Sequence, residues 1–228
     1  MEKMITVVYT RYGPPEVLEV KGVERPTPKP GEVLVHVRAT TLNRTDCGFR
    51  KPEYGFIIRP IHGFFKPRKK VLGTEFAGEV GAHAEYLCMP ERGSITYKPT
   101  NMSYEEAAAV CDGLMLGMNI IRSINFTKAK KILVNGASGS IGTACVQLAV
   151  HYGAEVTAVC APQSMELVRS LGAKEVLDYT KQDFTVSGQV YDVVIDAVGK
   201  SSFFKCKKLL KPGGVYFSTE LGYLLQNV

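Results

Sequence analysis

The chain has 228 residues, of which 45% are hydrophobic and 22% charged, a composition that excludes an intrinsically disordered protein. Its length suffices for one large domain or two small ones. The net charge of +6 fits an anionic ligand without indicating one, and the absence of any apolar run of about 18 residues predicts no membrane-spanning helix.

The N-terminal part of the chain is predicted to be β-rich. The β-branched runs MITVVYT, VLEVKGVE and EVLVHVRAT are separated by Pro- and Gly-containing stretches that are typical of turns. Residues 51–70 are aromatic and basic, and we interpret them as a loop near a cleft. The basic run Lys66–Lys70 within it could contact nucleic acid, but such short runs are weak signals and a solvated loop is the preferred interpretation.

The pattern changes near residue 101. Ser103 followed by Glu106 forms a capping box and predicts the start of a helix. From residue 131 on, strands and helices alternate: KILVNG, EVTAVC, EVLDY, YDVVIDAVG and GVYFST as strands, and SIGTACVQLAVHY, SMELVRSL and FFKCKKLL as helices. This alternation is typical of an α/β fold with a parallel sheet and crossover helices.

The strongest local signal is a predicted phosphate-binding loop between the first strand and helix of that series. In ILVNGASGSIGTACVQLA, the register A-x-G-x-x-G would allow a pyrophosphate to approach the backbone at Gly139 and the helix to pack closely at Gly142. The helix N-terminus would offer free N–H groups to the phosphates. The residues predicted to bind the dinucleotide here are Ala137, Ser138, Gly139, Ser140, Ile141 and Gly142.

The end of the next strand bears on which dinucleotide is bound. An acidic residue there would hold the ribose hydroxyls of NAD, but Cys160 occupies that position. Without a carboxylate to repel a 2′-phosphate, NADP(H) is favoured. Ser164, Arg169 and Lys174 could supply donors, although an exposed helix charge is the simpler interpretation of Arg169.

Together these features resemble the medium-chain dehydrogenase/reductase superfamily, and most nearly its zinc-independent quinone oxidoreductase-like branch. Matching segments include PGEVLVHVRATTLNRTD, VLGTEFAGEV, GAHAEYLCMPE, GASGSIGTACVQLA, YDVVIDAVGK and LLKPGG, in the family's order. The resemblance implies a GroES-like β-rich substrate domain over residues 1–112, a Rossmann domain over residues 113–228 and an active site in the cleft between them. It also implies that Tyr179 contacts the adenosine phosphate end of the cofactor and that Gly199 faces the nicotinamide end.

The resemblance also bears on metal binding. Zinc-dependent members carry a Cys-x-x-Asp motif where this chain has Asn43-Arg44-Thr45-Asp46, and a Gly-His-Glu motif where it has Gly73-Thr74-Glu75. Cys111 falls in the region of the third ligand, but one thiolate cannot hold a catalytic zinc, which takes three protein ligands. We therefore expect no metal. The six cysteines form no C-x-x-C pair, which fits a reducing, cytoplasmic location.

Members without zinc reduce a quinone or an activated C=C bond with NADPH, and the resemblance implies this activity on a small-molecule carbonyl or quinone substrate. Hydrogen-bond donors aimed at the developing oxyanion would assist the reaction. Asn43 is one candidate, whose amide could donate to the substrate carbonyl or to the nicotinamide ribose, with a helix-capping role as the alternative. Tyr54 is another, with a packing role as the alternative. Asp46 is expected to be structural. An alcohol dehydrogenase without zinc and a non-enzymatic NADPH-binding protein stay open as other functions, and a homodimer stays open as the assembly.

Two departures from the family pattern stand out. A segment of a few tens of residues that relatives carry is missing between Val80 and Gly81, and the chain stops early, after five predicted Rossmann strands. Either the chain is a truncated product or residues have been omitted from the sequence. We favour omission, because a direct join would leave unpaired strand edges, which proteins avoid.

Overall fold

The computed structural model describes residues 2–51, 63–68, 70–71, 73–79 and 85–219. The chain divides into two compact units, Met1–Cys111 and Asp112–Val228, which we describe separately. The boundary expected from the sequence, after residue 112, lies one residue further along. The join between residues 80 and 81 falls outside the described residues.

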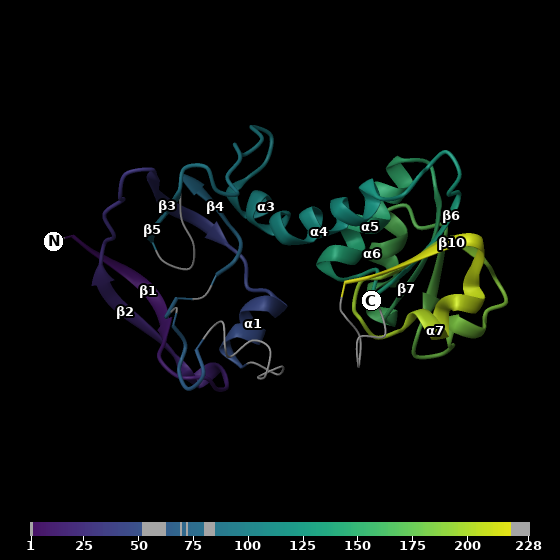
Figure 1. The fold of residues 1–228 in the computed structure, drawn as a ribbon, viewed down its shortest axis with the longest axis horizontal. Helices are drawn as coiled ribbons and strands as arrows, with labels where there is room; N and C mark the ends of the chain where they lie inside the picture. Colours follow the sequence, from purple (N-terminus) through teal and green to yellow (C-terminus); the bar gives the residue numbers. More distant parts are fainter. Residues whose placement is uncertain (1, 52–62, 69, 72, 80–84, 220–228) are drawn as a thin grey trace. The chain divides into compact units, whose positions relative to one another are not determined.

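The first unit is built from two small antiparallel sheets (Figure 1). In one sheet β1 pairs with β2, and in the other β3 lies between β4 and β5. Val35 is buried in β3 and its neighbours Val33 and Val37 are half-buried. The strands are β1 (Lys3–Tyr9), β2 (Leu18–Glu24), β3 (Glu32–Thr40), β4 (Phe76–Glu79) and β5 (Tyr86–Pro90). The three N-terminal runs predicted as strands are therefore confirmed.

Two short helices accompany these sheets, α1 (Arg44–Arg50) and α3 (Tyr104–Ala109). The predicted capping box is present at α3: the N–H of Glu106 donates to Ser103 Oγ at 3.1 Å, and the N–H of Ser103 donates to Glu106 Oε2 at 2.8 Å. Helix α1 begins in the same way after Asn43. Both helix starts thus satisfy free backbone N–H groups with side chains.

The second unit is a five-stranded parallel sheet in the order β10-β9-β6-β7-β8. This order matches that of the first five strands of a Rossmann sheet. The strands are β6 (Lys131–Asn135), β7 (Glu155–Cys160), β8 (Glu175–Asp178), β9 (Tyr191–Asp196) and β10 (Leu210–Ser218). The helices are α4 (Cys111–Arg122), α5 (Ser140–His151), α6 (Met165–Ser170) and α7 (Phe203–Cys206).

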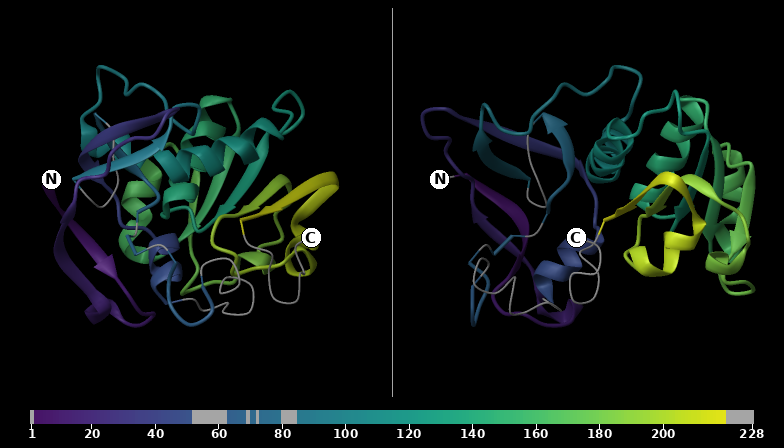
Figure 2. Two further views of the ribbon diagram at one scale, coloured as in Figure 1. Left: turned by 60° about the vertical axis from the view of Figure 1, so that its left-hand side comes forward. Right: turned by 45° about the vertical axis from the view of Figure 1, so that its right-hand side comes forward.

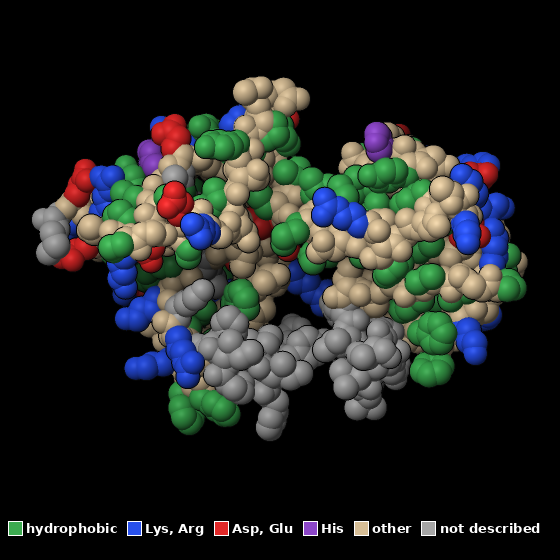
Figure 3. Space-filling model, turned by 45° about the horizontal axis from the view of Figure 1, so that its top comes forward, with side chains coloured by type: hydrophobic (Ala, Val, Ile, Leu, Met, Phe, Trp, Pro, Cys, Tyr) green, Lys and Arg blue, Asp and Glu red, His purple; other side chains and the backbone are tan. Residues whose placement is uncertain are grey.

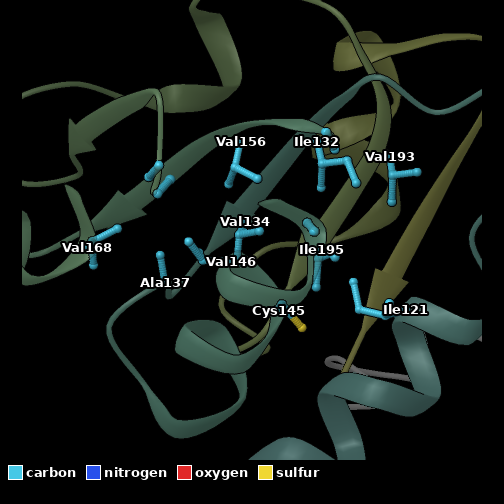
Figure 4. Packing of buried hydrophobic residues seen from close by; sticks show 14 of the residues in the cluster. Ile121, Ile132, Val134, Ala137, Cys145, Val146, Val156, Val168, Val193 and Ile195 are labelled. Carbon is cyan, nitrogen blue, oxygen red and sulfur yellow. The ribbon is translucent and has the colours of Figure 1, made fainter. Parts of the chain in front are cut away.

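Hydrophobic residues cover both faces of this sheet, because successive residues of a strand point to opposite sides. Ile132 and Val134 of β6 lie in one hydrophobic cluster with Cys145 and Val146 of α5, and Figure 4 shows Val134 beside Val146. Leu133 packs on the opposite face, in a cluster with α7. In Figure 2, α5 and α6 (green) accordingly lie on one side of the sheet and α7 (yellow) on the other.

The predicted elements of this unit are confirmed with one difference. The stretch predicted as a single helix, FFKCKKLL, forms one α-helical turn in α7 and then a 3-10 turn, Lys207–Leu209. Strand β10 then begins at Leu210, before the predicted GVYFST. Among the described residues, none of the helices has both the length and the apolarity needed to cross a membrane.

Candidate functional site

The predicted phosphate loop connects β6 to α5 in the second unit. The N–H groups of Gly136 and Ala137 both donate to Val159 O at 3.0 Å, which ties the loop to β7. Gly139 is the N-cap of α5, and no side chain caps the helix. Gly139 and Ser140 are exposed, Ser138 and Ile141 are half-buried, and Ala137 is buried. The N–H groups of the first turn therefore have no side-chain acceptor at a helix end that favours anions.

The glycines of this loop serve different purposes. A Cβ on Gly142 would lie 2.1 Å from Gly136 O, so packing of the helix on the turn requires glycine there. Gly136 has a φ of 76°, which favours glycine independently of packing. A Cβ on Gly139 would meet only Gly136 O, at 3.5 Å, an ordinary contact. The fold therefore does not require glycine at position 139, and the open space above its Cα leaves room for a ligand.

Helix α4 packs closely onto the start of α5. A Cβ on Gly113 would lie 2.0 Å from Ser140 Oγ, and one on Gly117 would lie 3.0 Å from Ala144 Cβ. The four-residue spacing on both helices brings the small residues into contact along one line. This close crossing fixes the first turn of α5, where the N–H groups predicted to bind phosphate lie.

At the end of β7, Cys160 is buried, and its pKa is raised by burial and then by the nearby carboxylate of Asp178. The positive charge of Arg169, exposed on α6, acts in the opposite direction on the same thiol. Ser164 is half-buried before α6, and its side chain makes no capping hydrogen bond. The strand end thus carries a thiol with a guanidinium in its electrostatic neighbourhood.

A carboxylate that sequence reasoning did not consider lies beside Cys160, on the neighbouring strand. Asp178 is paired with Cys160 in the sheet and is 5% exposed. Its Oδ1 accepts from the N–H and the hydroxyl of Thr180, at 2.8 and 2.7 Å, and Lys181 Nζ lies 3.9 Å from its Oδ2. Hydrogen bonding to Thr180 is the main cause of its lowered pKa. The next residue, Tyr179, is 58% exposed and therefore accessible to a ligand.

A second network, also missed by sequence reasoning, joins the ends of β6, β9 and β10. Asp196, fully buried, accepts from Asn135 Nδ2 at 3.0 Å, from the N–H of Ser201 at 2.8 Å and from the Tyr216 hydroxyl at 3.3 Å. Burial first and then Asp196 raise the pKa of Tyr216. The network anchors the turn containing Gly199, whose φ is 62°. The sequence signal that could have revealed this network is the polar residue that ends each otherwise apolar run, Asn135 in KILVN and Asp196 in YDVVID.

In the first unit, pairing of β3 with β4 brings Asn43 and Thr74 together, because one follows β3 and the other precedes β4. Asn43 Nδ2 donates to Thr74 Oγ1 at 3.0 Å and to Glu75 Oε2 at 2.9 Å. Asn43 Oδ1 accepts from the N–H of Asp46 at 3.1 Å. Asn43 is therefore the N-cap of α1, which is the alternative role that the sequence suggested. Both its amide nitrogen and its amide oxygen are hydrogen-bonded within the protein.

Asp46 is structural, as expected. It is fully buried, and its carboxylate accepts from the N–H of Asn43 at 3.0 Å and from the N–H of Gly73 at 3.1 Å. These bonds hold the turn after β3 against the segment before β4. Glu75, 5% exposed, adds a bond from the Thr41 hydroxyl.

The position of Tyr54 lies outside the described residues, so its assignment stays a prediction. Within the described part of the chain, no three His, Cys, Asp or Glu side chains are arranged to hold a metal ion. On the face drawn in Figure 3, Lys and Arg side chains are spread over both units with acidic side chains between them.

The sequence matches two known protein families. The family described as alcohol dehydrogenase GroES-like domain matches residues 29–118, and the family described as zinc-binding dehydrogenase matches residues 140–223.

Several characterised proteins are similar along most of the chain. A 2-methylene-furan-3-one reductase of Solanum lycopersicum is 32% identical over 90% of this chain and 59% of its own length. The chloroplastic NADPH-dependent alkenal/one oxidoreductase of Arabidopsis thaliana is 30% identical over 93% of this chain and 61% of its own length. The chloroplastic quinone-oxidoreductase QR1 of Triphysaria versicolor is 33% identical over 84% and 67%. The chain thus spans about three fifths of the length of the first two relatives.

Solved structures show the same fold. The quinone oxidoreductase of Coxiella burnetii superposes with a TM-score of 0.84 at 22% identity, over 95% of this chain and 75% of that one. The quinone oxidoreductase of Thermus thermophilus, studied also as its complex with NADPH, gives a TM-score of 0.77 at 28% identity, over 93% and 72%.

Proposed function

Because the chain belongs to the medium-chain dehydrogenase/reductase superfamily, in its quinone oxidoreductase-like branch, we propose that it reduces quinones or α,β-unsaturated carbonyl compounds with NADPH. The activities for which several relatives are named, 2-methylene-furan-3-one reductase, alkenal/one oxidoreductase and quinone oxidoreductase, support this class of substrate.

The observation that carries the proposal is the fit of the phosphate loop to a dinucleotide. Space above Gly139 and uncapped N–H groups at the start of α5 provide a cradle for a pyrophosphate. Tyr179 and Ser164 would contact the adenosine end, and the Gly199 turn, held by Asp196, would lie at the nicotinamide end. When bound, the cofactor would supply the hydride. The protein's part is to orient it and to present the substrate.

The preference for NADPH over NADH rests on charge at the end of β7. No carboxylate takes the place of Cys160. The carboxylate of Asp178 on the neighbouring strand is buried, its Oδ1 accepts from Thr180, and Lys181 Nζ lies 3.9 Å from its Oδ2. Arg169 and Lys181 bring positive charge to the same strand ends, where it would favour a 2′-phosphate. This arrangement supports NADP(H) as the cofactor.

The chemistry we propose does not require zinc. Two of the three positions that hold zinc ligands in zinc-dependent members are occupied by Asn43 and Thr74, which are hydrogen-bonded to each other. A catalytic zinc takes three protein ligands, and a neutral amide and a hydroxyl are not the thiolate and imidazole that it prefers. Reduction of an activated C=C bond or a quinone fits such a site better than alcohol oxidation, which needs the alcohol oxygen polarised.

Steady-state assays of the purified chain test the proposal. We expect NADPH oxidation with a panel of quinones and α,β-unsaturated ketones and aldehydes, and a lower KM for NADPH than for NADH. Tight NADPH binding without turnover across the panel would favour the non-enzymatic alternative instead. A cytoplasmic location, a homodimer and a direct role for Tyr54 stay predictions, and relatives include chloroplastic and mitochondrial proteins.

A further inference from the structure

The orientation of the Asn43 amide is fixed by its neighbours. The N–H of Asp46 needs an acceptor, so the amide oxygen of Asn43 must face it, at 3.1 Å. The amide nitrogen therefore faces Thr74 Oγ1 and Glu75 Oε2, at 3.0 and 2.9 Å. A flipped amide would place an oxygen against the Glu75 carboxylate and a nitrogen against a backbone donor, which is unfavourable on both sides.

This orientation decides which way the Thr74 hydroxyl points. Because Thr74 Oγ1 accepts a hydrogen from Asn43, its own proton must be directed elsewhere. Among the described residues no acceptor for that proton is present, and Thr74 is exposed. Accepting one hydrogen bond polarises a hydroxyl and makes it a better donor in a second. Within the part of the chain that the structure describes, the Thr74 hydroxyl is therefore an oriented donor with no protein acceptor, at an exposed position of the first unit.

We propose that Thr74 Oγ donates a hydrogen bond to the carbonyl oxygen of the substrate, and that Asn43 and Glu75 are positioning residues that orient it. This inference rests on the proposed function and deepens it, since it names the group that recognises the carbonyl. Asn43 itself is a poorer donor to substrate, because both of its amide hydrogens are already used and releasing one from Glu75 would remove a hydrogen bond from a nearly buried carboxylate.

The hydrogen bond strengthens as the reaction proceeds. When a hydride reaches the β-carbon of an enone, a new C–H bond forms there and the C=C π electrons move to the carbonyl oxygen, which becomes an enolate. Bound NADPH would supply this hydride and leave as NADP⁺, and a proton from water would later add to the α-carbon. The charge builds on the oxygen that faces Thr74, so the bond contributes more in the transition state than in the ground state.

Four variants of the full chain test this assignment. Thr74→Val keeps the shape of the side chain and removes the donor, and Thr74→Ser restores a hydroxyl. Asn43→Ser keeps an N-cap for α1 but removes the amide donors. Thr45→Val, at an exposed threonine on α1, is the matched control for the chemical change. Thermal unfolding of each variant shows that it is folded.

The first readout is kinetic, with trans-2-hexenal as the enal probe. We expect Thr74→Val to lower kcat about 100-fold, the range for loss of one oxyanion donor, with little change in KM. Thr74→Ser should retain most of the rate and Thr45→Val all of it. Asn43→Ser should lose less than Thr74→Val, and adding it to Thr74→Val should cause no further loss, because the two act through one hydroxyl.

The second readout is the carbonyl stretch of ¹³C-labelled trans-2-hexenal bound with NADP⁺, a complex that does not react. We expect a shift to lower wavenumber in the wild type and Thr74→Ser, and no shift in Thr74→Val. If folded Thr74→Val had the kcat of the wild type and the same lowered carbonyl wavenumber, the assignment would be overturned while the proposed function stayed intact. A wild-type protein that reduces no quinone or enone would overturn the proposed function, and this assignment with it.

Discussion

The carbonyl oxygen of Gly136 lies 2.1 Å from the place that a Cβ on Gly142 would occupy. The two residues bring the turn after β6 and the first turn of α5 into direct backbone contact. The Cβ of a residue at position 139, by contrast, would find ordinary contact distances. Folding therefore requires glycine at position 142 but not at position 139, where we expect glycine to serve cofactor binding.

Gly142→Ala should mainly reduce stability, whereas Gly139→Ala should mainly reduce NADPH binding. Gly142→Ala forces the backbone of the turn to move, and we expect it to lower the free energy of unfolding by about 3 kcal/mol. Gly139→Ala should change stability little, because the φ of −79° suits alanine and the unfolded chain loses freedom, which offsets the poorer N-cap that alanine makes for α5. Its methyl group should nevertheless weaken NADPH binding at least tenfold, an order-of-magnitude expectation for a blocked pyrophosphate approach.

Urea denaturation and fluorescence titration with NADPH measure the two effects. Equal loss of stability in both variants, or unchanged NADPH affinity in Gly139→Ala, would contradict the assignment of position 139 to the cofactor.

Arg169→Ala should alter the choice between cofactors. If the guanidinium favours a 2′-phosphate, its loss should raise the Kd for NADPH about tenfold, the equivalent of one charge-assisted hydrogen bond, and leave the Kd for NADH nearly unchanged. Arg122→Ala, at an exposed arginine in the last turn of α4, is the control for a general change in charge. Titrations at two salt concentrations check the result, and parallel weakening of both cofactors would argue against recognition of the phosphate.

Asp196→Ala should destabilise the second unit. The substitution removes the acceptor of the buried Asn135 amide and of the N–H of Ser201, which is half-buried. Unpaired buried donors cost about 1–3 kcal/mol each, so we expect a loss of about 3 kcal/mol in the free energy of unfolding. Asn135→Ala should cost less, since it removes one of these bonds. Urea denaturation followed by circular dichroism is the measurement, and a loss within error of zero would contradict the role given to this carboxylate.

Asp192 should contribute stability that depends on pH. Burial alone would raise its pKa, but hydrogen bonds from Lys211 Nζ at 2.8 Å and from the N–H groups of Lys131 and Lys130 outweigh burial and lower it. A lowered pKa in the folded state means that the contribution is complete above the unfolded value of about 3.9 and is lost as pH falls through the folded value.

The stability difference between the wild type and Asp192→Asn should therefore shrink as pH falls from about 6 to about 3. Denaturation curves across this range measure the difference. Glu91→Gln, at an exposed carboxylate, serves as the comparison. A difference that stays constant with pH would show that the carboxylate titrates alike in the folded and unfolded chain.

Much of this architecture could be predicted because it is local. The A-x-G-x-x-G register between an apolar strand and a helix located the loop, and the capping box at Ser103 located α3. The strand runs of the second unit were recognisable because buried parallel strands are continuously apolar.

Relations between distant segments were beyond sequence reasoning. Asn43 and Thr74 are far apart in the chain, and only the pairing of β3 with β4 shows that the amide of one is engaged by the other. The same holds for Asp178, which lies beside Cys160 through strand pairing, and for Asp196, whose donors come from three segments. Such contacts depend on which strands pair with each other, and the residues of each strand taken alone do not show this.

The central claim, that this protein transfers a hydride to an activated C=C bond, is tested most directly by following a label. The purified chain is incubated with trans-2-hexenal and NADPH in which the transferred hydrogen at C4 of the nicotinamide is replaced by deuterium. The product is then examined by NMR. We predict a saturated aldehyde with deuterium at the β-carbon and none at the carbonyl carbon. Deuterium at the carbonyl carbon of an unsaturated alcohol, or no transfer at all, would contradict the claim.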